Sequence, residues 1–266
     1  MADNTQPCVI ITGASVGLGR DFVRRIAAEK RTMVLVARSQ QGLEDAAAEA
    51  RALGCDTHIL ALDLGLPEAT SKLVRFLADA NLHCDVLVAN AGFGVIGDAV
   101  DIGVTAQMAL LDLNIRALAE QTLTFLPGMA KRGRGGVLLV ASTASYFPGP
   151  YMTCYYASKA FVRSFGEALH EENKRKGVTV TTLCPGPVRT EFFERAGIQS
   201  ELLFKLLPRS NADNVVKAAW EGFLAGKRIV LPGIFTKLTA WSSAISPHWL
   251  VLPIVSRLQQ YRREKV

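Results

Sequence analysis

The amino-acid sequence predicts a doubly wound α/β fold, in which helices cover both faces of a parallel sheet of about seven strands. Three observations predict it. Short apolar, β-branched runs alternate with longer helical stretches, and the first run leads into a glycine-rich turn. The 266 residues are 49% hydrophobic and 20% charged, which is the composition expected of a single soluble globular domain spanning 1–266.

The expected strands are runs too short and too apolar to be half-exposed, which is typical of a parallel sheet. They lie at 8–12, 32–37, 57–62, 86–89, 137–141, 178–183 and 228–231. Helices are expected at 18–29, 43–53, 69–80, about 105–131, about 155–175 and about 211–224. This alternation predicts right-handed crossovers and a ligand site at the carboxyl ends of the strands.

Charge and cysteine content narrow the class of protein. The net charge is +6, and the basic residues are scattered, as is expected of an enzyme that binds an anionic cofactor. Nucleic-acid binding is not indicated, because the sequence has no basic stripe interleaved with aromatic residues. The polar, slightly acidic start lacks a signal-peptide pattern, so we expect a cytoplasmic location. The cysteines are odd in number and lack CxxC or CxxH spacing, which favours a reducing compartment and no metal site: Cys8, Cys55, Cys84, Cys154 and Cys184.

A glycine-rich turn joins the first expected strand to the first helix, reading Thr12-Gly-Ala-Ser-Val-Gly-Leu-Gly19. Glycines at this turn let the backbone approach a pyrophosphate, and the free N–H groups of the new helix attract that anion. We therefore expect a Rossmann-type dinucleotide site. Its expected contacts in this turn are Gly13, Ser15, Gly17, Leu18 and Gly19.

The second strand ends at Ala37, followed by Arg38 and Ser39. A site that prefers NAD usually has an acidic residue near this position, which binds the ribose 2′-hydroxyl. A guanidinium beside a hydroxyl instead suits the 2′-phosphate of NADP(H). We expect NADP(H) to be preferred over NAD(H); the alternative is that Arg38 is a solvated surface residue.

Two more turns follow strands on the side where the adenosine would lie. Asp63 ends the third strand and is expected to accept from the adenine amino group, although it suits a helix cap equally well. Asn90-Ala91-Gly92 ends the fourth strand with small residues that allow a cofactor close to the backbone. We expect Asn90 and Gly92 to bind the cofactor.

Tyr155 and Lys159 lie at positions i and i+4 of an expected helix, so the phenol and the ammonium share one helical face. A free tyrosine has a pKa of about 10, and a nearby ammonium favours its phenolate form. Ser142, at the end of the fifth strand, is placed to hold a substrate oxygen beside that phenol. These residues are candidates for general acid–base catalysis.

Taken together, these motifs resemble the short-chain dehydrogenase/reductase family, in its compact single-domain branch. The resemblance covers about residues 8–190. It rests on the glycine turn at 12–19, Asp63, Asn90-Ala-Gly92, Asn114, Ser142, Tyr155-xxx-Lys159 and Pro185-Gly-Pro-Val-Arg-Thr190.

The resemblance implies a role for each catalytic residue. Tyr155 would be the general acid in reduction and the general base in oxidation. Lys159 would bind the nicotinamide ribose and favour the phenolate form of Tyr155, and Ser142 would orient the substrate carbonyl. Asn114 would hold a water that links Lys159 to bulk solvent.

The same resemblance implies that the turn after the sixth strand binds the nicotinamide. Thr190 and the backbone at Val188 would grip the carboxamide, and Pro185 and Gly186 belong to the same cofactor-binding turn. This grip would set which face of the nicotinamide is presented to the substrate.

The resemblance says less about two segments, one where the family is variable and one where this chain departs from its compact pattern. Residues at about 191–210 are expected to form a variable substrate loop, and about 232–266 form an apolar C-terminal extension. We expect the stretch 249–255 to be buried over the substrate cleft or against a partner subunit; contact with a membrane surface is the less favoured alternative. A homodimer through the two long helices is the expected assembly.

The expected function is NADPH-dependent, reversible transfer of a hydride between nicotinamide and the carbonyl or alcohol group of an apolar small-molecule substrate. The same residues serve an NAD(P)-dependent alcohol dehydrogenase that works oxidatively. A non-catalytic dinucleotide-sensing protein is the alternative from another class, and it would typically have lost Tyr155 or Lys159, both of which this chain keeps.

Overall fold

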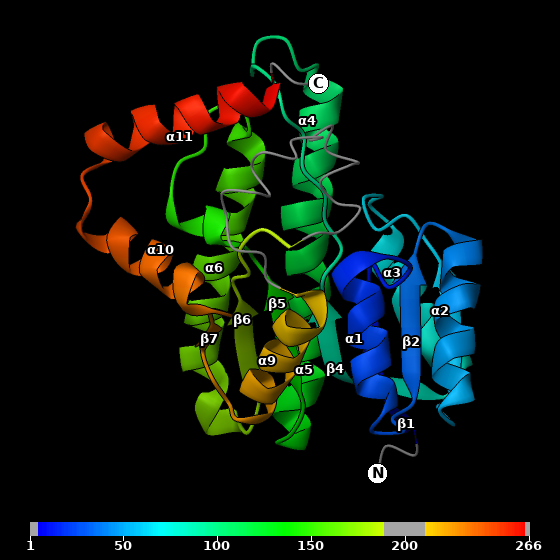
Figure 1. The fold of residues 1–266 in the computed structure, drawn as a ribbon. Helices are drawn as coiled ribbons and strands as arrows, with labels where there is room; N and C mark the ends of the chain where they lie inside the picture. Colours follow the sequence, from blue (N-terminus) through cyan, green and yellow to red (C-terminus); the bar gives the residue numbers. More distant parts are fainter. Residues whose placement is uncertain (1–4, 189–210, 264–266) are drawn as a thin grey trace.

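The computed structural model describes residues 5–188 and 211–263. Within them, seven parallel strands form one sheet in the order β3-β2-β1-β4-β5-β6-β7 (Figure 1). The strands are β1 Gln6–Thr12, β2 Met33–Ala37, β3 Thr57–Ala61, β4 Leu82–Ala89, β5 Gly136–Val140, β6 Thr179–Leu183 and β7 Ile229–Val230. The order reverses between β1 and β4, which opens a crevice at their carboxyl ends. The predicted doubly wound fold is confirmed.

Strand β4 begins at Leu82, four residues before the start expected from the sequence. Its first half pairs with the start of β1, where Gln6 lies opposite Leu82 and Cys8 opposite Cys84. The polar side chains of His83 and Asp85 alternate with buried residues in this half, so it lacks the continuous apolar run that marks a buried strand.

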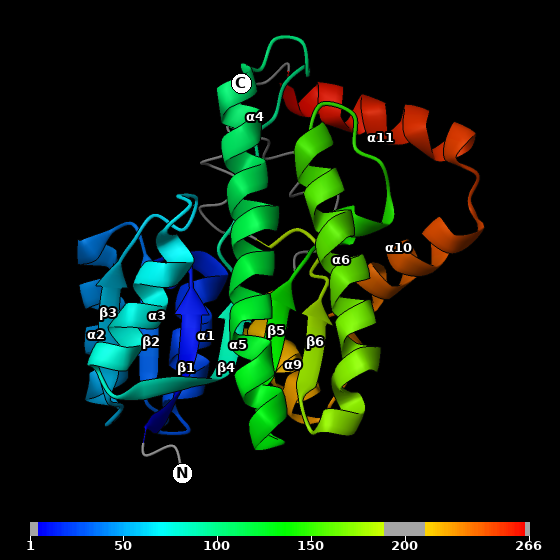
Figure 2. The ribbon, with the colours of Figure 1, turned by 180° about the vertical axis from the view of Figure 1, so that it is seen from behind.

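Helices cover both faces of the sheet, as Figures 1 and 2 show from opposite sides. One layer contains α1 Gly17–Ala27, α2 Gln40–Ala52 and α9 Ala212–Leu224. The other contains α3 Ala69–Asp79, α5 Leu118–Arg132 and α6 Thr153–Asn173. Side chains of β1 alternate between the layers, as the two-residue period of a strand requires: Val9 and Ile11 pack on the first, Cys8 and Ile10 on the second.

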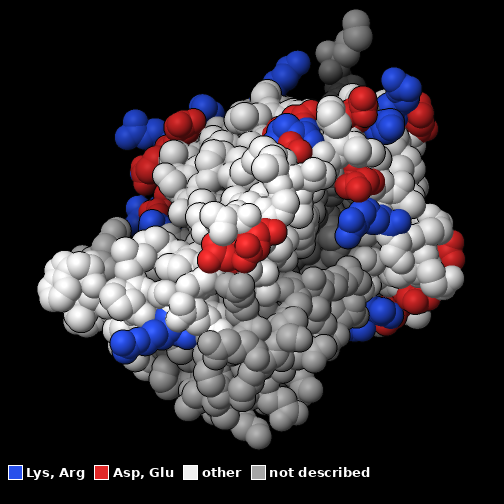
Figure 3. Space-filling view, turned by 90° about the horizontal axis from the view of Figure 1, so that it is seen from above, with Lys and Arg blue, Asp and Glu red and all other residues white. Residues whose placement is uncertain are grey.

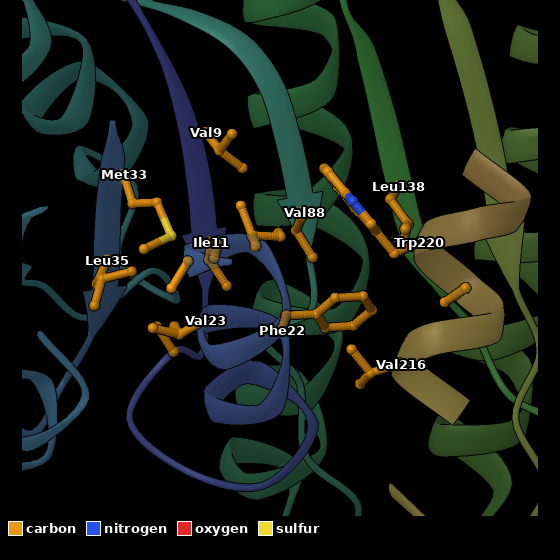
Figure 4. Close-up of a cluster of buried hydrophobic side chains, with 14 of the residues drawn as sticks. Val9, Ile11, Phe22, Val23, Met33, Leu35, Val88, Leu138, Val216 and Trp220 are labelled. Carbon is orange, nitrogen blue, oxygen red and sulfur yellow. The ribbon is translucent and has the colours of Figure 1, made fainter. Parts of the chain in front are cut away.

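The core of the first layer is shown in Figure 4, where Phe22 of α1 and Trp220 of α9 lie against the sheet beside Val88 and Leu138. Both aromatic rings are fully buried. The Trp220 indole N–H donates to Glu29 Oε1 at 2.5 Å, so its polar atom is satisfied. This packing joins α1 to α9 and fixes the helix that follows the glycine turn.

The long helix expected at about 105–131 is not one regular helix. It consists of α4 Val104–Leu111, a π-helical turn Asp112–Ala117, and α5. A π-helical turn inside an α-helix often marks a functional site, and this one contains Asn114. Its wider hydrogen-bonding pattern changes the helical phase between α4 and α5.

The last two helices, α10 Ile234–Ile245 and α11 His248–Arg263, form a C-terminal hairpin that leaves the sheet and returns above its carboxyl edge (Figures 1 and 2). Trp249, Leu250 and Ile254 stay largely exposed. Burial over the cleft, one of the two placements expected for 249–255, is therefore not what the structure shows. Among the residues described, none of the helices combines the length and the hydropathy needed to cross a bilayer.

Candidate active site

A cleft of about 660 Å³ opens at the carboxyl ends of the strands. Its lining brings together residues from six loops that are far apart in the sequence. The predicted site residues among them are Gly13, Ser15, Gly17, Leu18, Arg38, Ser39, Asp63, Asn90, Gly92, Ser142, Tyr155, Lys159, Pro185, Gly186 and Val188. One cavity thus joins the glycine turn to the tyrosine and lysine of α6.

Within the glycine turn, Gly13 and Gly17 have φ angles of +65° and +54°, in the left-handed region that favours glycine. Gly19 has a different role from the one expected. A Cβ at this residue would lie 2.0 Å from the carbonyl oxygen of Gly13, so its missing side chain lets α1 pack against the turn. Gly19 is buried and does not line the cleft.

Thr12 and Asn90 tie the glycine turn to the end of β4. The Asn90 side-chain amide donates to the carbonyl oxygens of Thr12, at 2.9 Å, and Gly13, at 3.3 Å. The Thr12 hydroxyl oxygen accepts from the backbone N–H groups of Asn90 and Ala91, each at 3.0 Å. Asn90 therefore shapes the turn as well as lining the cleft. Thr12 is not among the predicted site residues, since its sequence signal is no more than a hydroxyl residue at the end of the first strand.

The first turn of α1 suits an anion. Its N-cap residue, Val16, has no side-chain group to cap the helix, and Val16, Gly17 and Leu18 all line the cleft. Free N–H groups and the positive end of the helix dipole at this position match a pyrophosphate. The residues present therefore fit a dinucleotide, with its phosphates at α1.

Arg38, Ser39 and Asp63 lie where β2 and β3 end. Arg38 has an exposed side chain on the cleft and, among the described residues, no salt-bridge partner. The Ser39 hydroxyl oxygen accepts from Gly42 N at 3.1 Å and caps α2, while its proton remains available as a donor. Asp63 Oδ1 accepts from Gly65 N at 2.9 Å. Asp63 thus stabilises its own turn and also lines the cleft. It does not cap the next helix, whose N-cap is Glu68, and its contact with adenine stays a prediction.

The inner end of the cleft is formed by Tyr155, Lys159 and Ser142. Lys159 Nζ lies 5.8 Å from the centre of the Tyr155 ring and donates to the carbonyl oxygen of Val140 at 2.9 Å. The Lys159 side chain is only 5% exposed, and this burial lowers its pKa from 10.5 to about 8. Ser142 follows β5, and its Oγ accepts from Ala144 N at 3.1 Å, which fixes the hydroxyl oxygen in the turn.

Asn114 is buried behind this group and does not line the cleft. Its amide bonds to both backbone groups of Phe93: Oδ1 accepts from the N–H at 3.1 Å, and Nδ2 donates to the carbonyl oxygen at 2.9 Å. Nδ2 also donates to Ser158 Oγ at 3.1 Å, and Ser158 donates to the carbonyl oxygen of Tyr155 at 2.7 Å.

This chain of hydrogen bonds connects the π-helical turn to the first turn of α6. Gly92 is essential to it, because a Cβ there would lie 2.9 Å from Asn114 Oδ1 and 3.5 Å from Lys159 Nζ. Asn114 therefore holds the loop after β4 and the helix that carries Tyr155. The water-holding role implied by the family resemblance stays a prediction. Ser158 and the Val140 carbonyl, neither of which the sequence marks as a site group, complete this arrangement.

The turn after β6 closes the cleft with Pro185, Gly186 and Val188. Gly186 packs against the start of the C-terminal hairpin, where a Cβ would lie 2.9 Å from Thr236 Cγ2. Thr190 and the expected substrate loop at about 191–210 lie outside the described residues.

The fold and this site define a dinucleotide-dependent oxidoreductase of the Rossmann type. The profile of the short chain dehydrogenase family matches residues 7–232. The chain therefore belongs to the short-chain dehydrogenase family, and it is an oxidoreductase that acts on carbonyl or alcohol groups.

Similar proteins include reductases of oxoacyl compounds. The chain is 28% identical over 260 residues to the very-long-chain 3-oxoacyl-CoA reductase of Macaca fascicularis, covering 96% of this chain and 80% of that protein. It is 32% identical over 227 residues to the ketoacyl reductase HetN of Nostoc sp., covering 82% of this chain and 77% of that protein.

Solved structures show the same architecture. A short-chain dehydrogenase from Sphingobium yanoikuyae in complex with NADPH superposes with a TM-score of 0.79 at 30% identity, covering 90% of this chain and 93% of that one. A 7β-hydroxysteroid dehydrogenase superposes with a TM-score of 0.83 at 23% identity, covering 97% and 98% of the two chains, which shows the common fold.

Burial of the Lys159 ammonium predicts a pH-dependent difference in stability between the protein and a Lys159→Met variant. The pKa of Lys159 is about 8 in the folded chain and 10.5 as its ordinary value. Below about pH 8 the Lys159 amine is protonated in both the folded and the unfolded protein, so folding buries a charge. Between about pH 8 and pH 10.5 the amine is largely neutral in the folded protein but still protonated in the unfolded one, so the unfolded state binds more protons. The free energy of unfolding of the unmodified protein should therefore rise relative to the variant, by up to about 1.4 kcal/mol per pH unit.

Urea unfolding of both proteins at a series of pH values across this window measures the difference between their free energies of unfolding. Contributions from titratable groups that both proteins contain cancel in this difference. A difference that stays constant from about pH 7.5 to about pH 10 would show that folding does not lower the pKa of Lys159.

Proposed function

We propose that this protein is an NADPH-dependent reductase of the keto group of 3-oxoacyl thioesters or similarly apolar carbonyl compounds. The observation that carries the proposal is the single cleft that has Arg38 at one end and Tyr155 with Lys159 at the other. A dinucleotide bound along the glycine turn would place its adenosine near the first and its nicotinamide near the second.

Arg38 supports the choice of NADPH. The exposed guanidinium lies on the cleft, Ser39 Oγ keeps a proton to donate, and the next strand end supplies Asp63 on the adenine side. A 2′-phosphate matches the fork of donors of an arginine better than a ribose hydroxyl does. The Sphingobium yanoikuyae enzyme, which was solved with NADPH, is consistent with this choice.

The residues of this chain supply the acid–base part of the reduction. When bound, the nicotinamide supplies the hydride to the carbonyl carbon. Ser142 holds the carbonyl oxygen by a hydrogen bond, and the phenol of Tyr155 donates the proton that this oxygen takes up. Lys159, which Val140 and burial hold in place, stabilises the phenolate that remains until solvent returns the proton.

The remaining cleft wall suits an apolar substrate. Phe93, Leu113, Ala144, Met152 and Pro187 all line it close to the catalytic group. Buried Met152 packs against the partly buried rings of Tyr155 and Tyr156, which leaves an apolar surface beside the phenol. Together with the similarity to oxoacyl reductases, this wall favours an acyl chain over a sugar or another strongly polar substrate.

The test is NADPH consumption by the purified protein with a panel of carbonyl compounds. We expect turnover with 3-oxoacyl-CoA thioesters, rising with acyl-chain length, and little with polar sugars. The same panel with NADH should give lower kcat/KM throughout. Turnover confined to polar ketones would contradict the substrate class.

The panel also separates the alternatives. Turnover only from alcohols with NADP+ would favour an oxidative dehydrogenase, and NADPH binding without any turnover would favour a dinucleotide sensor.

The expected homodimer through the long helices stays a prediction, which sedimentation of the purified protein tests. A cytoplasmic location is proposed from the cysteines, all five of which are free thiols.

A further inference from the structure

The C-terminal hairpin presents large apolar side chains to solvent on both of its helices. On α10, Ile234, Leu238 and Trp241 follow one another at positions i, i+4 and i+7, so they share one face. Ile234 is 69% exposed and Trp241 is 65% exposed. Two exposed turns of apolar side chains in succession form a patch that soluble monomers rarely display.

Helix α11 continues the patch. Trp249, Leu250 and Ile254 lie on its outer side, and Trp249 is 75% exposed. The opposite side contacts the protein, where buried Gln259 donates to the Tyr156 hydroxyl at 2.7 Å. Near the end of the helix, exposed Gln260 also donates to the Tyr151 hydroxyl at 2.5 Å. The hairpin is thus attached beside the catalytic tyrosine by one side and uncovered on the other. In Figure 3 its corner is the uncharged lobe at the left.

Charge distinguishes between the surfaces that this patch could meet. Residues 232–266 contain five Lys or Arg residues and a single acidic residue, Glu264, so this short segment supplies much of the net charge of +6. Lys237 and Arg257 are exposed next to the apolar side chains of the hairpin. Residues 232–263 contain no acidic side chain with which the basic residues of a second hairpin could pair. An anionic surface attracts them.

We propose that the C-terminal hairpin docks on the surface of an anionic lipid bilayer. Exposed tryptophans with flanking lysine and arginine, on helices too short or too polar to span, are the pattern of segments that lie in the membrane interface. Trp241 and Trp249 enter the headgroup region, and Lys237 and Arg257 contact anionic headgroups.

Docking in this way holds the substrate cleft close to the lipid. The inner side of α11 is bonded through Gln259 to Tyr156, the residue next to Tyr155 in the first turn of α6. An apolar substrate dissolved in the bilayer then has a short path to the catalytic phenol. This inference concerns binding and holds whether or not oxoacyl thioesters are the substrate.

The test is binding of the full-length protein to vesicles of phosphatidylcholine alone and of phosphatidylcholine mixed with phosphatidylglycerol. We expect association with the mixed vesicles that weakens as salt is added. The protein has three tryptophans, and Trp220 is fully buried. A blue shift of emission on binding should therefore come from Trp241 and Trp249, and it should vanish in Trp241→Ala/Trp249→Ala.

Two pairs of variants sharpen the result. Lys237→Gln/Arg257→Gln should weaken partitioning by about fivefold for each cation removed. Lys131→Gln/Lys217→Gln, which removes two exposed lysines from α5 and α9, is the matched control and should bind as the unmodified protein does.

Equal losses in the cationic variant and its control would contradict the proposal, as would absence of binding to the mixed vesicles. Sedimentation in the absence of lipid tests the other occupant. A dimer that Trp241→Ala/Trp249→Ala dissociates would show that a second copy covers the hairpin and overturn the proposal. NADPH affinity without lipid should be the same in every variant, since none of these residues lines the cleft.

Discussion

Replacing Tyr155 by phenylalanine should reduce turnover at least about 100-fold, because the substitution removes the general acid and general acid–base catalysis typically contributes 10²–10⁴-fold. Affinity for NADPH should change little. Lys159 keeps its bond to the Val140 carbonyl oxygen, and the glycine turn keeps its bonds to Asn90, so the cofactor side of the cleft is unaffected. Single-turnover kinetics and a fluorescence titration measure the two effects separately.

Tyr156→Phe is the matched control. It removes a phenolic hydroxyl from the neighbouring residue of the same helix, one that Gln259 contacts. Its turnover should stay within a few-fold of the unmodified protein. Near-normal turnover in Tyr155→Phe with any substrate would exclude Tyr155 as the proton donor.

Arg38→Ala should weaken NADPH binding by about 10- to 150-fold, the range that corresponds to a charge-assisted hydrogen bond to phosphate worth about 1.5–3 kcal/mol. NADH affinity should be nearly unchanged, because NADH has no 2′-phosphate. The ratio of the two dissociation constants, measured by fluorescence titration, gives the result directly.

Arg175→Ala is the control for the loss of one exposed arginine. Arg175 lies between the end of α6 and the amino end of β6, whereas the cleft opens at the carboxyl ends of the strands, so both cofactor affinities should be unchanged. Equal weakening of NADPH and NADH by Arg38→Ala would show that Arg38 has no specific contact with the 2′-phosphate.

Periodicity predicts most of the fold because buried parallel strands have a local signature. The run at 32–37 matches β2 to within a residue, since every side chain of Met33–Ala37 is buried. Where tertiary pairing overrides the local pattern, the prediction fails. Leu82 belongs to β4 only because Gln6 lies opposite to it. The π-helical turn at Asp112–Ala117 likewise lies where Asn114 bonds to Phe93 and Ser158, which are distant in the sequence.

In the candidate site, too, residues with a local sequence signature can be predicted and those that depend on tertiary contacts cannot. Residues that need a particular side chain in a particular turn, such as Gly13, Tyr155 and Lys159, can be identified from spacing. The acceptor of the Lys159 ammonium is a backbone carbonyl, which any residue at position 140 supplies, so no sequence pattern marks it. Thr12 gains its importance from the approach of β4, which becomes apparent only in three dimensions.

The exposed C-terminal hairpin is a third case in which the sequence alone does not predict the structure. The amino acids of 249–255 indicate that the segment avoids water, but composition does not specify whether the covering surface belongs to the same chain. In the structure, Val251, Leu252 and Val255 are partly covered while Trp249 and Ile254 are not. Both sides of α11 are apolar, and only one of them meets the protein.

The bonds between Thr12 and Asn90 also determine what cofactor binding has to do. They join the backbones at the ends of two strands, β1 and β4, before any ligand arrives. A loop that is already ordered loses little conformational entropy when the pyrophosphate binds, so more of the interaction free energy is retained as affinity. The dinucleotide phosphates are therefore expected to bind without rearrangement of the glycine turn.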